Sequence, residues 1–196
     1  MADPPETSLS MLQGMREDDS QQWDRFVRLF GPLVFSWCRR RDIPEQDAAD
    51  IVQEVFRGVA GQIASFQKEG PHDTFRGWLR RITQHKIADY FRLLAKGAAP
   101  RGGSTANMQM QTVAFDDANA QDDQELEEDT QALYLRALEL IEGNFEARTW
   151  RAFWQVAVED KSPEVVAREL EMTNGAVYNA KYKVLRRLRE EFKDLL

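Results

Sequence analysis

The stretch from Phe75 to Lys96 constrains the fold more than any other part of this sequence. At about 100° per residue, its large apolar side chains fall on one broad side of a helix and its basic and amide side chains on the other. The apolar side holds Phe75, Trp78, Leu79, Ile82, Tyr90 and Leu94. The opposite side holds Arg81, Gln84, His85, Ala88 and Arg92. This pattern predicts a helix whose basic side suits a polyanion, although an ordinary solvated face would look the same.

The residues before this stretch continue the helical spacing. A second helix is predicted from Glu45 to Ile63, with an apolar stripe through Ile51, Val55 and Val59. Its polar side carries Asp50, Gln53, Glu54 and Arg57. Upstream, the segment from Trp23 to Cys38 is also helical, and Gly31-Pro32 is predicted to kink or interrupt it. Because strand-type alternation is absent, these segments predict an all-α domain over residues 7–96.

The composition changes at Gly97. The segment that follows is small and polar, and Ala114–Asp129 carries eight acidic residues and no basic one. Few large apolar groups are available there to offset the entropy of ordering the chain. We therefore predict a flexible acidic linker over residues 97–129, joining two small helical domains.

The second predicted domain spans residues 130–196. Asn144 is predicted to cap its second helix, and Ser162-Pro163-Glu164 is a helix start with a clear physical basis. A three-residue turn, Glu171-Met172-Thr173, leads to a last helix that ends near Phe192. A short helix, a tight turn and a long helix make the outline of a helix-turn-helix.

The last helix has a basic outer side. Five basic residues and no acidic one lie between Gly175 and Arg189. Asn179 can read an adenine edge, while Lys181 and Lys183 can hold phosphates. A plain helical hairpin with a basic exposed face is the alternative interpretation.

Composition excludes several classes of protein. The net charge of −7 argues against a surface that is basic throughout. Cys38 is the one cysteine, and neither His72 nor His85 stands at ligand spacing with a second histidine or cysteine. Because no catalytic carboxylate pair is evident either, we expect no enzyme activity, no cofactor and no metal. No apolar run approaches the length of a membrane span, so we expect a cytoplasmic protein without membrane insertion.

Two motifs carry a family resemblance. The run D-I-V-Q-E-V-F occupies Asp50–Phe56, and F-R-G-W-L begins at Phe75. With the linker and the helix-turn-helix behind them, they make the chain resemble the extracytoplasmic-function group of bacterial RNA polymerase sigma factors, from about Thr7 to Leu196. The resemblance implies that the protein binds core RNA polymerase, recognises promoter DNA and starts transcription. It also implies an anti-sigma factor as a further partner.

The resemblance implies three sets of site residues. Those that would bind core polymerase are Asp50, Gln53, Glu54 and Arg57. Those that would read the minus-ten promoter element are Arg76, Trp78, Arg80, Arg81, Gln84, His85, Lys86 and Arg92, with the Ser65–Thr74 loop trapping a flipped base. Those that would read the minus-thirty-five element are Asn174, Ala176, Tyr178, Asn179, Lys181, Tyr182, Lys183 and Arg186.

Two other functions fit parts of the sequence. A free-standing helix-turn-helix regulator would need only the C-terminal domain, and a sigma-like interaction protein would lack promoter activity.

Glu171 stands where family members commonly have glycine in the turn. If its φ is positive, the conformation costs about 1 kcal/mol.

Overall fold

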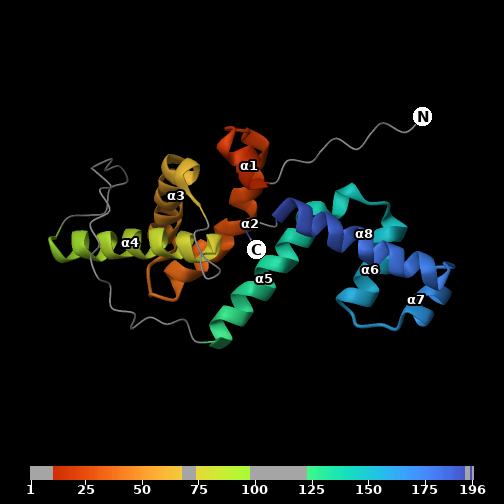
Figure 1. The fold of residues 1–196 in the computed structure, drawn as a ribbon. Coiled ribbons are helices and arrows are strands. Elements are labelled where there is room, and N and C mark those ends of the chain that lie inside the picture. Colours follow the sequence, from red (N-terminus) through yellow and green to blue (C-terminus); the bar gives the residue numbers. More distant parts are fainter. Residues whose placement is uncertain (1–10, 68–73, 98–122, 193–194, 196) are drawn as a thin grey trace. The chain divides into compact units, whose positions relative to one another are not determined.

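The computed structural model describes residues 11–67, 74–97, 123–192 and 195 of the chain. Within these residues all regular structure is helical, which confirms the all-α prediction (Figure 1). The α-helices are α1 (Met11–Arg16), α2 (Ser20–Arg39), α3 (Glu45–Gln62), α4 (Phe75–Ala95), α5 (Asp123–Ile141), α6 (Ala147–Ala157), α7 (Pro163–Glu169) and α8 (Asn174–Phe192). Two short 3₁₀ helices, η1 (Ile63–Ser65) and η2 (Glu142–Asn144), follow α3 and α5.

Packing divides the chain into two units. Unit 1 contains Met1–Leu29 and Tyr134–Leu196, and unit 2 contains Phe30–Leu133. Both α2 and α5 therefore contribute residues to each unit. The predicted domains 7–96 and 130–196 stay predictions, and most of the predicted linker, residues 98–122, lies outside the described residues.

In unit 2, helices α3 and α4 pack directly against each other. Their core contains the predicted stripe of Ile51, Val55 and Val59, all buried. At the start of α4, Phe75 is fully buried, and its ring lies 5.4 Å from that of Phe30 and 5.2 Å from that of Phe66. Burial of several large apolar side chains fixes α4 against the rest of the unit and so determines which of its sides faces outward.

The two ends of α4 differ. At its N-terminus, Thr74 caps the helix by accepting a hydrogen bond from the Gly77 amide at 3.0 Å. Near its other end, Leu94 is 44% exposed, although the helical pattern placed it on the packing side. Tyr90 is the last large buried side chain of α4, and its hydroxyl donates to Asp47 of α3 at 2.7 Å.

Helix α2 runs through Gly31-Pro32 without interruption. The predicted interruption was wrong, although Pro32 removes one helical amide donor. Leu33 and Val34, which follow it directly, are both buried. Cys38, near the end of α2, is a buried free thiol, and burial raises its pKa to about 12.

In unit 1, α6, α7 and α8 pack against one another, and α1 contacts α8. A small apolar core joins these helices through Ala152, Val166, Ala167, Val177 and Ala180. The predicted helix start at Ser162 is confirmed: its side chain accepts from the Val165 amide, and Pro163 is the first helical residue. Asn144 ends η2, and Glu146 occupies the N-cap position of α6, so the predicted Asn144 cap was wrong.

A buried ion pair joins α2 and α8 within unit 1. Glu191 of α8 is 1% exposed, and its carboxylate pairs with Arg25 of α2 and, at 3.1 Å, with Arg187. A buried carboxylate requires such partners, because an unpaired charge loses its hydration without compensation. The end of α8 is therefore held by charge as well as by Phe192, which is also buried.

Candidate functional site

Helix α3 presents the predicted polymerase-docking side outward. Asp50, Gln53 and Arg57 are all exposed, and their spacing places them on one side of the helix. Glu54 is half-buried between two cations. It accepts from Arg57 Nη1 in its own helix and lies 3.5 Å from Lys86 Nζ of α4. The docking side therefore has an exposed edge and one carboxylate that also ties α3 to α4.

Helix α4 does present an outward polar side. Arg81 and His85 are exposed, and Gln84 is half-buried next to them. Arg92 is exposed farther along and pairs with Asp89 one turn before it. These residues form a narrow surface on the side of α4 away from its core. An arginine and an amide on such a surface can reach phosphate oxygens and base edges.

The other predicted minus-ten residues contact protein. Trp78 is half-buried, and its ring lies 5.0 Å from Phe66 and 5.3 Å from Phe75. Lys86 lies toward α3, where it pairs with Glu54. Arg76 donates to the Thr130 hydroxyl of α5. The predicted flipped-base loop falls mostly on residues 68–73, which lie outside the described residues.

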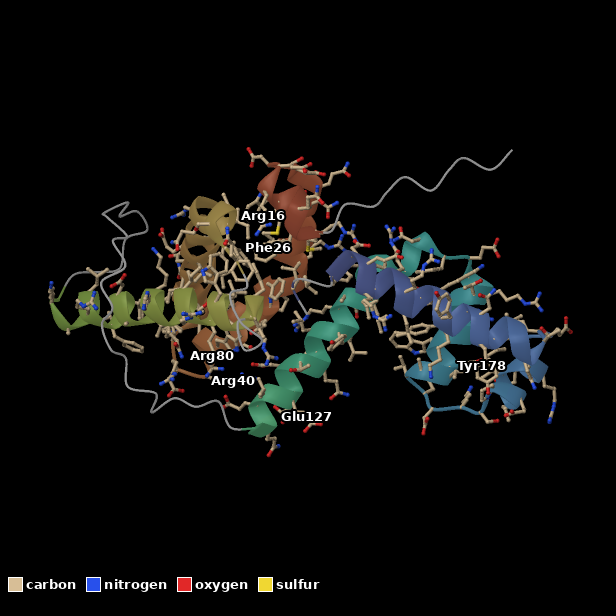
Figure 2. All side chains as sticks on the ribbon, viewed as in Figure 1. Arg16, Phe26, Arg40, Arg80, Glu127 and Tyr178 are labelled. Carbon is tan, nitrogen blue, oxygen red and sulfur yellow. The ribbon has the colours of Figure 1, made fainter. Side chains whose placement is uncertain are left out.

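Arg80 is also turned toward protein. Its guanidinium lies 5.8 Å from the centre of the Trp37 ring, a cation–π contact. Burial lowers the pKa of Arg80, and the nearby carboxylates of Asp129 and Glu125 partly oppose that shift. Figure 2 shows Arg80 and Arg40 close together beside the first turns of α5.

The start of α5 provides a contact that the sequence interpretation missed. Residues 123–129, predicted as the end of the linker, form the first turns of this helix. Asp129 is 4% exposed and accepts a hydrogen bond from Trp37 Nε1 at 2.8 Å. Arg40 donates to both oxygens of the same carboxylate, at 2.7 and 3.1 Å. This bidentate hydrogen bond raises the pKa of Arg40 above its usual value.

Helical spacing was the available signal for this contact. Asp129 precedes Leu133, Ala137 and Ile141 at intervals of four residues, and all three are buried. It therefore continues the buried side of α5 toward the N-terminus. The acidic composition of the segment concealed this pattern, because composition alone favours disorder.

Helix α8 presents its predicted polar side openly. Tyr178 and Tyr182 are 56% and 60% exposed, while Val177, Ala180 and Val184 face the core. The remaining polar residues predicted there are exposed or half-buried: Asn174, Asn179, Lys181, Lys183 and Arg186. Ala176 is half-buried. Of this set, Arg186 alone makes an ion pair with a described residue, Glu190 at 3.2 Å. Figure 2 labels Tyr178 on this helix.

In the turn between α7 and α8, Glu171 has a positive φ of 50°. The Met172 amide bonds to the Ala167 carbonyl at 2.8 Å and the Glu171 amide to that of Arg168 at 3.4 Å. This is a Schellman motif with a glutamate where glycine is usual. Arg148 of α6 donates to the carbonyls of Leu170 and Glu171 and so holds the turn from outside.

Two negative findings concern the described residues. They contain no group of three or more His, Cys, Asp or Glu that could hold a metal ion. None of their helices combines the length and hydropathy that crossing a bilayer requires.

Comparison with known protein families gives a match for part of the chain. Residues 26–96 match the family model for sigma-70 region 2. The match covers most of α2 and all of α3 and α4. No curated protein matches the chain. The family match supports a sigma-70-type factor, and with it a role in RNA polymerase binding and promoter recognition.

Proposed function

We propose that this protein is a sigma factor of the extracytoplasmic-function group, which binds core RNA polymerase and directs it to specific promoters. The observation that carries the proposal is the sigma-70 region 2 match over residues 26–96. Two features of the structure support it. The exposed edge of α3 holds Asp50, Gln53 and Arg57, and α4 presents Arg81 and His85 outward.

Each helix has a separate part in the proposed mechanism. The exposed polar side of α3 docks on the polymerase, where polar side chains would contribute hydrogen bonds and ion pairs at the rim of the interface. The outward side of α4 contacts the minus-ten element. Because Arg81 is exposed and pairs with no described residue, it can move to a phosphate or a base edge without breaking an internal contact.

The C-terminal part of the proposal rests on α7 and α8. A seven-residue helix, a tight turn and a long helix fit a helix-turn-helix, in which α8 enters the major groove at the minus-thirty-five element. Its exposed tyrosines and amides would face the bases, and Lys183 would face the backbone. The proposed protein acts in the cytoplasm, without catalysing a reaction of its own, and an anti-sigma factor restrains it.

Run-off transcription with purified core polymerase and genomic promoter fragments tests the whole proposal. We expect promoter-specific transcripts that depend on the protein. DNA binding without any effect of core polymerase would instead indicate a free-standing regulator. Binding to core polymerase without transcripts would indicate a sigma-like interaction protein.

Two variants locate the surfaces. Asp50→Lys reverses an exposed charge on α3 and is expected to weaken core binding by about tenfold, as losses at interface residues of this kind are about 1–2 kcal/mol. It is a cleaner test than Glu54→Lys, which would also break the pair with Lys86. The matched control is Glu139→Lys on the exposed side of α5. Equal affinities of both variants for core would rule out α3 as the docking side.

Arg81→Ala tests the outward side of α4. We expect slower promoter opening with core binding retained, because the lost cation contacts DNA and not polymerase. Arg151→Ala, which removes an exposed arginine from α6, is the control. Normal opening kinetics for Arg81→Ala would remove α4 from the proposed reading surface.

A further inference from the structure

The contact between α5 and the rest of unit 2 is built as an anion-binding site. One carboxylate, that of Asp129, receives three hydrogen bonds, one from Trp37 and two from Arg40. Both donor residues come from the end of α2, and the carboxylate is almost completely buried against them. A guanidinium that donates two parallel bonds matches a carboxylate or a phosphate equally well.

The site has more donors than Asp129 uses. Arg80 lies over Trp37, beside the carboxylate, and its Nη1 is buried without a hydrogen-bond partner among the described residues. Buried donors normally have partners, so Arg80 Nη1 is a donor that a further acceptor could use. Asp129 Oδ2 already accepts from Trp37 and Arg40, and Oδ1 accepts from Arg40. The non-bridging oxygens of a backbone phosphate can likewise each accept more than one hydrogen bond, so one phosphate can serve both arginines.

The segment that fills the site is held there mainly by polar contacts. Besides Asp129, the polar contacts of this segment include the Arg76–Thr130 hydrogen bond and an approach of Glu125 to Arg40 at 3.9 Å. Leu126 is 36% exposed, and the apolar anchoring of α5 begins at Leu133. A ligand with the same charge can thus replace the start of α5 with little loss of buried apolar surface.

We propose that Trp37, Arg40 and Arg80 bind a backbone phosphate of DNA, and that Asp129 occupies this site in the free protein, so that DNA must displace the first turns of α5. The proposal rests on the proposed function, because Arg76 and Arg80 belong to the predicted minus-ten set. It adds that the acidic start of α5 imitates the ligand and covers part of the reading surface until DNA arrives.

Binding of non-specific DNA by the full-length protein, without core polymerase, tests the competition. The probe is a fluorescein-labelled duplex of random sequence, followed by anisotropy at low salt. Asp129→Asn is expected to bind it about tenfold more tightly than the wild type, because the competing charge is gone. Glu127→Gln makes the same charge change two residues away on the exposed side of α5 (Figure 2) and is expected to stay within about twofold.

A second substitution identifies the phosphate-binding residue. Adding Arg40→Ala to Asp129→Asn is expected to reverse the gain in affinity, since the bidentate donor is then missing. Equal binding by Asp129→Asn and Glu127→Gln would overturn the proposal. A gain that survives Arg40→Ala would also overturn it, because DNA would then bind elsewhere.

Hydrogen exchange on the wild-type protein tests the same proposal without relying on a variant that folds correctly. We expect DNA to increase exchange of the amides in residues 126–133, as the start of α5 leaves its site. Unchanged or stronger protection in that segment would contradict the proposal. Neither measurement uses core polymerase or a promoter, so the proposed sigma activity can fail in transcription while this competition is still observed, and the reverse holds too.

Discussion

The basic sides of α4 and α8 looked alike in the sequence, but the structure uses them differently. On α4, Arg76, Lys86 and Arg92 contact Thr130, Glu54 and Asp89, and Arg80 lies over Trp37. On α8, the side chains of Tyr178, Asn179 and Lys183 are exposed and bond to no described residue, although Arg186 pairs with Glu190. A cation that already has a protein partner loses that contact when it binds DNA, whereas an exposed one loses mainly water and counterions.

The difference predicts two modes of binding. The α8 surface should bind DNA as a preformed face, with a strong dependence on salt. On α4, Arg81 can bind directly, but the other cations must first leave their protein partners, so the binding energy is smaller than the number of cations suggests. Four substitutions, each with a control, test this difference between the two surfaces.

The largest effect is expected for Phe75→Ala. This substitution removes a fully buried ring that contacts the rings of Phe30, Phe66 and Trp78. We expect a loss of about 3–5 kcal/mol in the free energy of unfolding, measured by urea denaturation. Phe91→Ala, on the exposed side of the same helix, should cost less than about 1 kcal/mol. Similar losses would mean that α4 is not anchored at its start.

Tyr90→Phe should remove about 2 kcal/mol, because it deletes a hydrogen bond to the charged Asp47. Tyr178→Phe on the open α8 surface should have almost no effect on stability. The hydrogen bond also raises the pKa of Tyr90 to about 12.

This pKa shift has a signature in pH. Because the folded protein holds the phenol proton more tightly, the stabilisation is complete below about pH 10 and is lost as the pH rises toward about 12. Across that window the wild type should lose more stability than Tyr90→Phe. Parallel pH profiles for the two proteins would show that the hydrogen bond does not form in solution.

Asn179→Ala tests the preformed α8 surface. If Asn179 reads a base edge, its loss should reduce discrimination between the preferred duplex and one with a single changed base pair by about 1–3 kcal/mol. Lys183→Ala should weaken binding to both duplexes equally and lower the salt slope by about one. Identical behaviour of the two variants would mean that Asn179 does not read a base edge.

The smallest effect is expected for Glu171→Gly. Glycine adopts positive φ without the steric cost that Glu171 bears, so we expect a gain of about 1 kcal/mol in thermal or urea unfolding. The same substitution at Glu169, the last residue of α7, should instead lose about 1 kcal/mol, because glycine disfavours the helix and the pair with Lys161 is removed. A loss at both positions would mean that the Glu171 side chain stabilises the turn in a way its exposure does not suggest.

Local signals in the sequence were enough for much of this fold. The spacing of Ile51, Val55 and Val59 predicted α3, and Ser162 with Pro163 predicted the start of α7, because both depend on neighbouring residues. A positive φ at Glu171 was considered as one possibility for the turn, and the structure has it. What failed depended on partners distant in sequence.

Three examples show why. Pro32 was expected to kink or interrupt α2, but the helix continues through it, and the next two residues, Leu33 and Val34, are buried. Asp129 was assigned to a linker by composition, although its partners, Trp37 and Arg40, lie about ninety residues earlier. Lys86 was assigned to DNA from the resemblance, and that assignment stays a prediction, but its ion pair with Glu54 of α3 was not foreseen. A helical period gives the direction of a side chain but not what it meets there.

The reactivity of Cys38 reports the opening of unit 2. This residue is the one thiol in the chain, it is buried next to Trp37, and its pKa of about 12 keeps it protonated and unreactive at neutral pH. An alkylating reagent can therefore modify it only when the surrounding helices part. The rate of that reaction in the native protein therefore measures how often unit 2 opens, and no label has to be introduced.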